Sequence, residues 1–241
     1  MHTSNSDIRA RARYLLDENI FGKDWLKSAI FSMALILFTS LVGGVFYLLS
    51  EWLLLPILVE YVLPYSFLLY IVLIVLISLF EAIVLNLLIG PIAIGFSAVH
   101  LELERGSGVV RIRRFFDGFS NTFLENVQLG VMYLLHSFLW TLLFFVPGVY
   151  VSYSYAMIYH VKYDNPEFTW QQCFDESERL MEGNRWRYFK LQCSFIGWYI
   201  LGLFAGFGFG LFWVNPYNQV STAVFYDTIK EEKELEADLL D

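Results

Sequence analysis

Lysine and arginine are absent from three long stretches of this sequence, residues 28–104, 115–161 and 191–229. Charged residues make up only 17% of the 241 residues and hydrophobic residues 57%, whereas a typical soluble chain is about 25% charged. One membrane crossing needs about 20 apolar residues, so each stretch has room for about two. The composition therefore excludes an ordinary soluble domain and predicts an all-α, polytopic integral membrane protein.

Residues and motifs that carry chemistry are equally scarce. The only two cysteines, Cys173 and Cys193, form no CxxC pair, which argues against a disulfide framework and a zinc site. The histidines lack the i,i+4 spacing of metal ligands, and HExxH, GxSxG, Walker A and GxGxxG motifs are missing. We therefore expect no catalytic residue, no metal and no cofactor, and we interpret the protein as non-enzymatic.

The net charge of −8 arises largely from an acidic tail at residues 230–241, which we interpret as a solvated cytoplasmic segment. We expect no nucleic-acid partner. Basic residues cluster before residue 24, at 105–114 and at 162–190. Because cytoplasmic segments of membrane proteins are enriched in Lys and Arg, these clusters place both termini in the cytoplasm.

The apolar pattern predicts a single transmembrane domain over residues 25–229, with a cytoplasmic insert at 164–187 and an amphipathic interfacial helix within residues 1–24. Pro91, Pro147 and Pro216 are predicted helix breaks. If Pro147 and Pro216 reverse the chain, there are six crossings and every basic segment lies inside; if they only kink helices, there are four. The positive-inside rule favours six. The six expected helices cover about residues 25–50, 66–104, 122–146, 148–163, 188–213 and 217–229.

Several polar residues within apolar segments are candidates for an intramembrane site. A carboxylate at the depth of Glu81, near Asn86, is costly in lipid and is therefore paired, protonated or hydrated. Two segments that follow prolines are also polar, and we expect them to face each other or a wet cavity. The alternative is a set of structural hydrogen bonds between helices. These segments contribute Tyr150, Ser152 and Tyr153, and Asn218 and Gln219.

Two further patterns predict packing. Gly202, Gly206 and Gly210 recur every fourth residue, which allows close helix approach within the chain or at a homo-oligomer interface. Residues 168–181 form an amphipathic helix with Thr169 as a plausible N-cap, lying along the inner membrane surface or under the bundle. The predicted apolar face of that helix consists of Trp170, Cys173, Phe174, Ser177 and Met181.

A series of short motifs runs along the chain in a fixed order. They are GPIAIG at 90–95, FDGF at 116–119, VPG at 146–148, YSYAM at 153–157, DNP at 164–166, SERLMEG at 177–183, SFIGW at 194–198, PY at 216–217 and FY at 225–226. In this order the motifs resemble the bacterial integral membrane proteins of family DUF975, a family of unknown function. The resemblance extends over nearly the whole chain and departs from the family in the acidic extension after Lys230. It implies a multi-helix bacterial membrane protein and supplies no activity or catalytic residue.

We therefore expect a protein of the bacterial inner (cytoplasmic) membrane that acts in envelope maintenance as a membrane scaffold or lipid-handling protein. Its expected partners are the lipid bilayer, other membrane proteins or a second copy. The alternative is a small transporter, or an export or immunity component, with a polar site around Glu81. A transporter predicts a water-accessible cavity lined by Glu81, whereas a scaffold predicts a closed, dry bundle.

Overall fold

The computed structural model describes residues 3–16, 22–107, 110–120, 122–143, 145–205 and 210–239. Helices joined by turns make up these ranges, which contain no strand, and this confirms the all-α class. The elements, in chain order, are α1 (Asn5–Leu15), α2 (Lys23–Leu49), η1 (Ser50–Leu54), α3 (Leu55–Tyr61), α4 (Phe67–Leu87), α5 (Ile89–Glu102), η2 (Leu103–Ser107), η3 (Ile112–Phe119), α6 (Phe123–Leu143), α7 (Phe145–Ser154), α8 (Ile158–Asp164), α9 (Trp170–Met181), α10 (Arg185–Ala205) and α11 (Leu211–Asp238).

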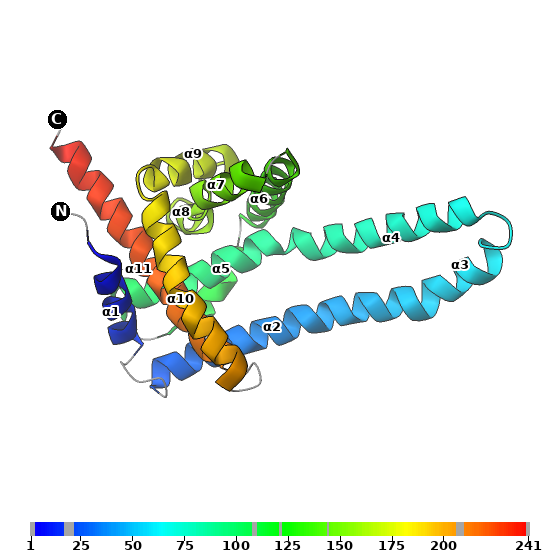
Figure 1. The fold of residues 1–241 in the computed structure, drawn as a ribbon, viewed down its shortest axis with the longest axis horizontal. Helices are drawn as coiled ribbons and strands as arrows, with labels where there is room; N and C mark the ends of the chain where they lie inside the picture. Colours follow the sequence, from blue (N-terminus) through cyan, green and yellow to red (C-terminus); the bar gives the residue numbers. More distant parts are fainter. Residues whose placement is uncertain are drawn as a thin grey trace.

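A long helical hairpin projects from a body formed by the other helices (Figure 1). Its first arm runs through α2, the π-helical turn η1 and α3, and its second arm is α4. Lys23–Tyr61 is the one helix of the described residues that is long and apolar enough to cross a membrane by length and composition. Residues 51–65, which connect the first two predicted helices, are therefore mostly helical. Pro56 does not break this segment, because the proline occupies the first turn of α3, where a missing N–H costs little.

The predicted helix at 66–104 is divided near Pro91. Helix α4 ends at Leu87, and α5 begins at Ile89 after a single connecting residue. Proline has no N–H to donate to the Leu87 carbonyl, so the hydrogen-bonding pattern is interrupted there. The next amide, that of Ile92, donates to Leu88 O at 3.0 Å and starts the new helix.

Pro147 and Pro216 have different roles. Pro147 lies in the first turn of α7, which packs back on α6, so the chain reverses there. Pro216 lies inside α11, and the interpretation of Pro216 as a turn is wrong. Helix α10 instead packs against α11 ahead of the proline, because Gly202 of α10 lies against Gly210, directly before α11 begins. Helix α11 continues through the proline because most of its residues from Val214 to Ile229 are buried, so tertiary packing outweighs the lost hydrogen bond.

The two ends of the chain lie together on the body (Figure 1), where Thr3 N donates to Glu232 Oε1 at 2.8 Å. Helix α1 begins with a capping box at Ser4. Its apolar residues Ile8 and Ala12 are buried, and the helix packs on α11. Protein therefore covers the apolar face that was expected to lie on lipid. The predicted separate tail is likewise a continuation of α11, which extends to Asp238.

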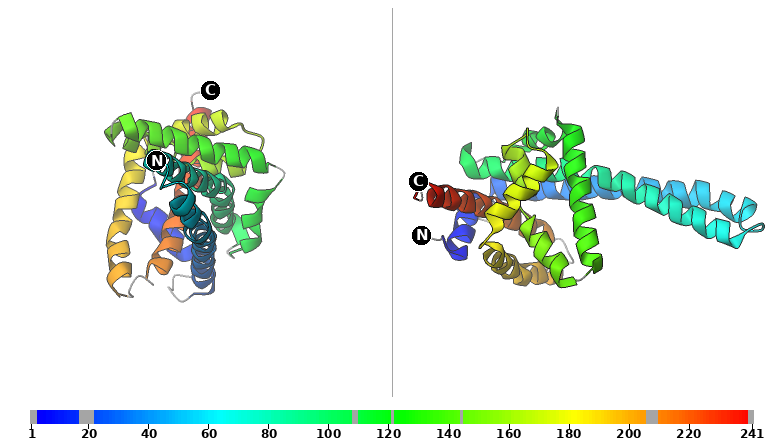
Figure 2. Two further views of the ribbon diagram at one scale, coloured as in Figure 1. Left: turned by 90° about the vertical axis from the view of Figure 1, so that its right-hand side faces the viewer. Right: turned by 90° about the horizontal axis from the view of Figure 1, so that it is seen from above.

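The predicted crossing helices do not share one direction. In Figure 2, α6 and α7 lie across the long axis of the hairpin. Glycines permit these close crossings. The Gly90 backbone of α5 contacts α6 so closely that a Cβ on Gly90 would lie 1.9 Å from Asn126 O, and one on Gly130 would lie 2.6 Å from Gly90 N. Gly95 and Gly118 bring α5 and η3 together in the same way.

We expect Gly90→Ala to lower the free energy of unfolding by at least about 2 kcal/mol, because the added methyl collides with backbone that cannot rotate away. Gly43→Ala is the matched control, since a Cβ added there would have no atom within 4 Å and alanine is the better helix former. Thermal unfolding of the detergent-solubilised variants checks this. Equal stability of Gly90→Ala and the wild type would contradict the crossing.

Candidate functional site

One guanidinium joins three separate helical segments of the body. Arg105, in η2, donates to both oxygens of Asp164 at the end of α8, at 2.5 and 2.9 Å. The same side chain donates to Asp227 of α11, at 2.6 Å from Nη2 and 3.0 Å from Nε. Both carboxylates are largely buried, with 6% and 14% of their side chains exposed. The contact therefore fixes the end of α5 relative to α8 and α11.

Asp164 accepts more hydrogen bonds than Arg105 alone provides. Tyr226 Oη donates to it at 3.0 Å, and Lys230 Nζ donates at 2.7 Å. Burial by itself raises the pKa of Asp164, but the bonds from Arg105 and Lys230 outweigh burial and hold the pKa below its usual value. An acid at a helix C-terminus is unfavourable, and these two cations offset that cost. The carboxylate is thus charged and saturated, as in a structural clamp.

Other buried polar groups of the body also have hydrogen-bond or ion-pair partners. Arg11 of α1 pairs with Glu104 at 2.6 Å. His100 Nδ1 lies 2.7 Å from the Phe96 carbonyl and must carry the proton, so Nε2 accepts from the Ser28 hydroxyl at 3.1 Å. The described residues contain no group of three or more His, Cys, Asp or Glu placed to hold a metal.

A buried lysine holds the start of the segment at 164–187, which the sequence predicts to be a cytoplasmic insert. Lys162 Nζ donates to Glu125 Oε2 at 2.9 Å and to the carbonyls of Pro166 and Phe168, each at 2.7 Å. All three ammonium protons therefore have acceptors, which a buried charge requires. Sequence reasoning did not single out Lys162 or Arg105. The position of Arg105 in the sequence could have drawn attention to it, because Arg105 is the first basic residue after the long stretch at 28–104 that lacks lysine and arginine.

The structure describes only part of the predicted intramembrane site. The side chains of Glu81 and Asn86 lie outside the part of the chain that the structure describes, although both residues belong to α4. On α7, Tyr150 lies under the Arg185 guanidinium, 4.5 Å from ring centroid to Cζ. Ser152 donates to Gly148 O of its own helix at 2.9 Å. Tyr150 and Ser152 therefore have partners within the body.

The two polar segments do not face each other, because α10 packs against both of them. Tyr153 of α7 contacts Tyr188 of α10 edge-on, with ring centroids 5.9 Å apart. On the other side, Asn218 Nδ2 of α11 donates to Gln192 Oε1 at 3.1 Å and to Tyr199 Oη at 2.9 Å. Gln219 is half-buried on α11. The arrangement corresponds to hydrogen bonds between helices, and the expectation that the segments face each other is wrong.

The predicted glycine face is also divided. Gly202 lies on α10, Gly210 precedes α11, and Gly206 lies outside the described residues. A Cβ on Gly202 would lie 2.9 Å from the Gly210 carbonyl carbon. The two glycines therefore oppose each other across an α10–α11 reversal and do not line one helix.

Helix α9 agrees closely with its prediction. Thr169 caps it in a capping box with Gln172, and Cys173, Phe174, Ser177 and Met181 are buried. Ser177 Oγ donates to Ser154 O at 2.9 Å and accepts from Met157 N at 3.2 Å. The apolar face of this helix is thus covered by the body.

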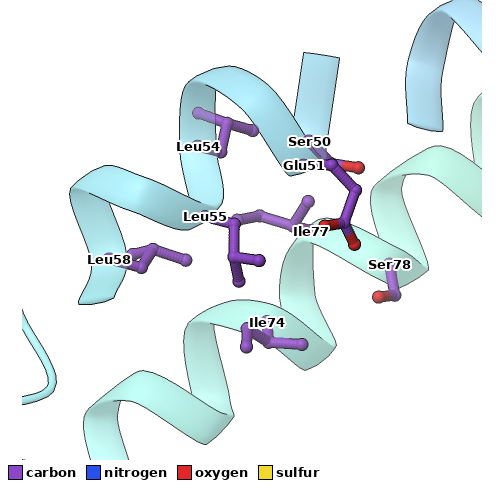
Figure 3. Close-up of a pocket in the computed structure, with 8 residues that line it drawn as sticks. All are labelled: Ser50, Glu51, Leu54, Leu55, Leu58, Ile74, Ile77 and Ser78. Atoms are coloured by element: carbon purple, nitrogen blue, oxygen red, sulfur yellow. The ribbon is translucent and has the colours of Figure 1, made fainter. Parts of the chain in front are cut away.

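Three cavities lie along the hairpin, two between its arms and one at its base. One of 90 Å³ contains Glu51 of η1 and Ser78 of α4 among its lining residues (Figure 3). Another of 410 Å³ lies further along the same arms, between Phe46 and Phe80. A third, also of 410 Å³, lies where α2 passes α5. The sequence did not predict any of them, because each depends on how the two arms pair.

We expect Asp164→Asn to lower the free energy of unfolding by about 2 kcal/mol, since it weakens charge-assisted hydrogen bonds from Arg105 and Lys230. Asp175→Asn on the exposed face of α9 is the matched control and should change stability by less than about 0.5 kcal/mol. Denaturant titration of both variants measures the difference. Equal stabilities would show that the network does not stabilise the body.

The same comparison has a defined pH dependence. Because the folded-state pKa of Asp164 is depressed, its stabilisation is present above the unfolded pKa, about 4, and is lost as the pH falls through the folded value. The difference between the wild type and Asp164→Asn should therefore stay constant from about pH 5 to 8 and shrink below about pH 4. A difference that grows on acidification would contradict this assignment.

Comparison with known proteins agrees with the motif resemblance. Residues 143–233 match the model of a family described as "Protein of unknown function (DUF975)". The motifs at 90–95 and 116–119 lie outside the matched range. No curated protein and no solved structure matches the chain. The matched range contains Asp164, Tyr226 and Lys230 of the charged network, whereas Arg105 precedes it. From the end of α6 into α11, this chain is thus similar to family DUF975, as its motifs predict.

Proposed function

We propose that this protein is a non-enzymatic membrane scaffold that handles lipid in maintenance of the bacterial envelope, anchored in the cell membrane by the α2–α4 hairpin. The exposed apolar surface of that hairpin carries the proposal. Leu41 is 67% exposed, Leu68 74% and Phe80 63%. Soluble monomers rarely expose contiguous apolar patches beyond a few hundred Å². A bilayer could cover this surface without leaving backbone polar groups unpaired, because the N–H and C=O groups of a helix bond to one another within the helix.

The distribution of basic and aromatic residues along the hairpin supports an orientation with its base on the cytoplasmic side and its tip on the outer side. Lys23 and Lys27 lie at its base, and Trp52, Tyr61 and Tyr65 lie towards its tip and are strongly exposed. Bases favour the cytoplasmic side and aromatic residues the interfaces. Helix Lys23–Tyr61 has 39 residues, or about 58 Å at 1.5 Å per residue, which exceeds a core of about 30 Å. The tip therefore extends past the core or the hairpin tilts.

Exposed apolar faces on α6 and α10 support further crossings, up to the six predicted from sequence with both termini in the cytoplasm. On α6, Leu124 is 79% and Leu142 70% exposed; on α10, Leu201 is 60% and Phe204 78% exposed. The reversals after α6 and after α10 agree with this threading. Because α6 lies across the hairpin in Figure 2, six crossings require strong helix tilts.

The hairpin cavities favour lipid handling over the alternative, a small transporter with a polar site around Glu81. The two of 410 Å³ are lined mainly by Leu, Ile, Val and Phe. A transporter of polar solutes needs convergent polar groups in its cavity. In the body, by contrast, the charged groups of the network pair with one another.

Matched leucines test the anchor. Leu41 on the hairpin and Leu235 near the end of α11 are 67% and 63% exposed. We expect Leu41→Lys to reduce the carbonate-resistant membrane fraction strongly, because a lysine near the centre of a bilayer costs about 2.5–3.5 kcal/mol. Leu235→Lys should leave that fraction unchanged. If both variants behave alike, or if Leu41→Lys yields a more soluble folded protein, the hairpin lies in water and the proposal fails.

Cysteine labelling tests the number of crossings. Native Cys173 is fully buried, and burial raises the pKa of its thiol to about 11, so we expect it to remain unlabelled. Gln171→Cys, in a Cys193→Ser background, adds a thiol at an exposed position of α9. With six crossings, an impermeant maleimide labels Gln171→Cys only after cells are permeabilised. Labelling in intact cells would support four crossings instead.

A further inference from the structure

An apolar groove lies at the base of the hairpin, between α2 and the start of α5. Its volume of 410 Å³ falls within the range of about 300–1,000 Å³ of small-molecule sites. Leu88, the single residue that connects α4 to α5, is among the residues that line it. The lining residues are Leu35, Phe38, Thr39, Val42, Leu88, Ile89, Ile92, Ala93 and Phe96.

The groove has almost no capacity to bind polar groups. Thr39 is its one polar side chain, and the Thr39 hydroxyl already donates to the carbonyls of Leu35 and Ile36, both at 3.0 Å. A polar solute would therefore lose its hydration without gaining partners. The chemistry of the lining suits a hydrocarbon chain.

The inner end of the groove leads to a basic segment. Phe96 stacks on Phe31 with ring centroids 5.6 Å apart, and Phe31 contacts Phe115 edge-on at 5.3 Å. Phe115 belongs to η3, which packs along α5. The aromatic cluster therefore connects the inner end of the groove to η3, which supplies the arginines.

Positive charge is in excess at η3. Arg111 and Arg114 both pair with Glu102, at 3.1 and 3.3 Å, and Arg114 also reaches Asp117 at 3.4 Å. Arg113 is exposed and forms no ion pair with a residue that the structure describes. Three arginines thus meet two carboxylates, and the surplus favours an anion.

We propose that this groove binds one acyl chain of an anionic phospholipid, with the lipid phosphate at η3 beside Arg113. The inference rests on the proposed function, since the lipid enters from the bilayer around the hairpin. The groove is continuous with the exposed apolar surface of α2, so a chain reaches it without crossing a polar barrier. The apolar lining holds the chain, and the arginines select the headgroup.

Photo-crosslinking of the full-length protein tests the groove. The probe is phosphatidylglycerol with a diazirine in its acyl chain, reconstituted in vesicles, and the crosslinked residues are mapped by mass spectrometry. Crosslinks should concentrate on the groove. Ala93→Trp and Val42→Trp fill it from opposite sides, and each should reduce crosslinking at Phe38 and Phe96 at least fivefold. Leu37→Trp, on the exposed face of α2, is the control and should change it less than twofold.

A separate comparison tests the headgroup. We expect the phosphatidylglycerol probe to crosslink at least threefold more than the phosphatidylcholine probe, and Arg113→Gln should abolish this preference. Equal crosslinking of the two probes by the wild type would overturn the role given to η3. Uniform crosslinking around α2, unaffected by either groove-filling variant, would overturn the site itself. Carbonate-resistant membrane association of the same samples distinguishes these results from failure of the membrane anchor.

Discussion

The ion pairs between Arg105 and the carboxylates of Asp164 and Asp227 determine how the body is put together. Each partner comes from a different part of the chain, so no local sequence preference can replace the contact. Arg105 also follows α5 directly, and α5 is the helix into which the second arm of the hairpin leads. A displacement of this guanidinium would therefore move the base of the hairpin relative to α8 and α11. The network is balanced in charge, because two cations meet two anions.

Close backbone contacts provide the second constraint on α5. Gly90 and Gly95 remove the side chains that would otherwise separate this helix from α6 and η3. Helices that approach through glycine gain many small dispersion contacts but tolerate no added volume. Helix α5 is thus held on two faces by glycine contacts and at its end by ion pairs. These contacts hold the hairpin to the body through α5, so that the arms of the hairpin, α2 to α4, present their apolar surface away from the body.

In the proposed function, the body provides a closed, stable structure and the hairpin provides the surface that contacts lipid. The body buries its polar residues in hydrogen-bonded pairs between helices, such as Asn218 with Gln192 and Tyr199. Such pairs stabilise a closed structure and leave few groups to act on a solute. The hairpin instead has exposed leucines and phenylalanines and encloses apolar cavities. A scaffold that holds lipid at its anchor combines the two surfaces.

The sequence alone determined the helical class, the break at Pro91, the reversal at Pro147 and the capped, amphipathic helix that begins after Thr169, because each follows from local backbone chemistry or from periodicity. It also carried the family motifs after residue 143. Only the tertiary structure decided which apolar faces meet protein. The face of α1 with Ile8 and Ala12 has the pattern of a lipid-facing helix, yet α11 covers it. Likewise Pro216 resembles a break, but burial of α11 keeps its helix continuous. Periodicity predicts that a face is apolar, but the element that covers it depends on contacts between residues far apart in the chain.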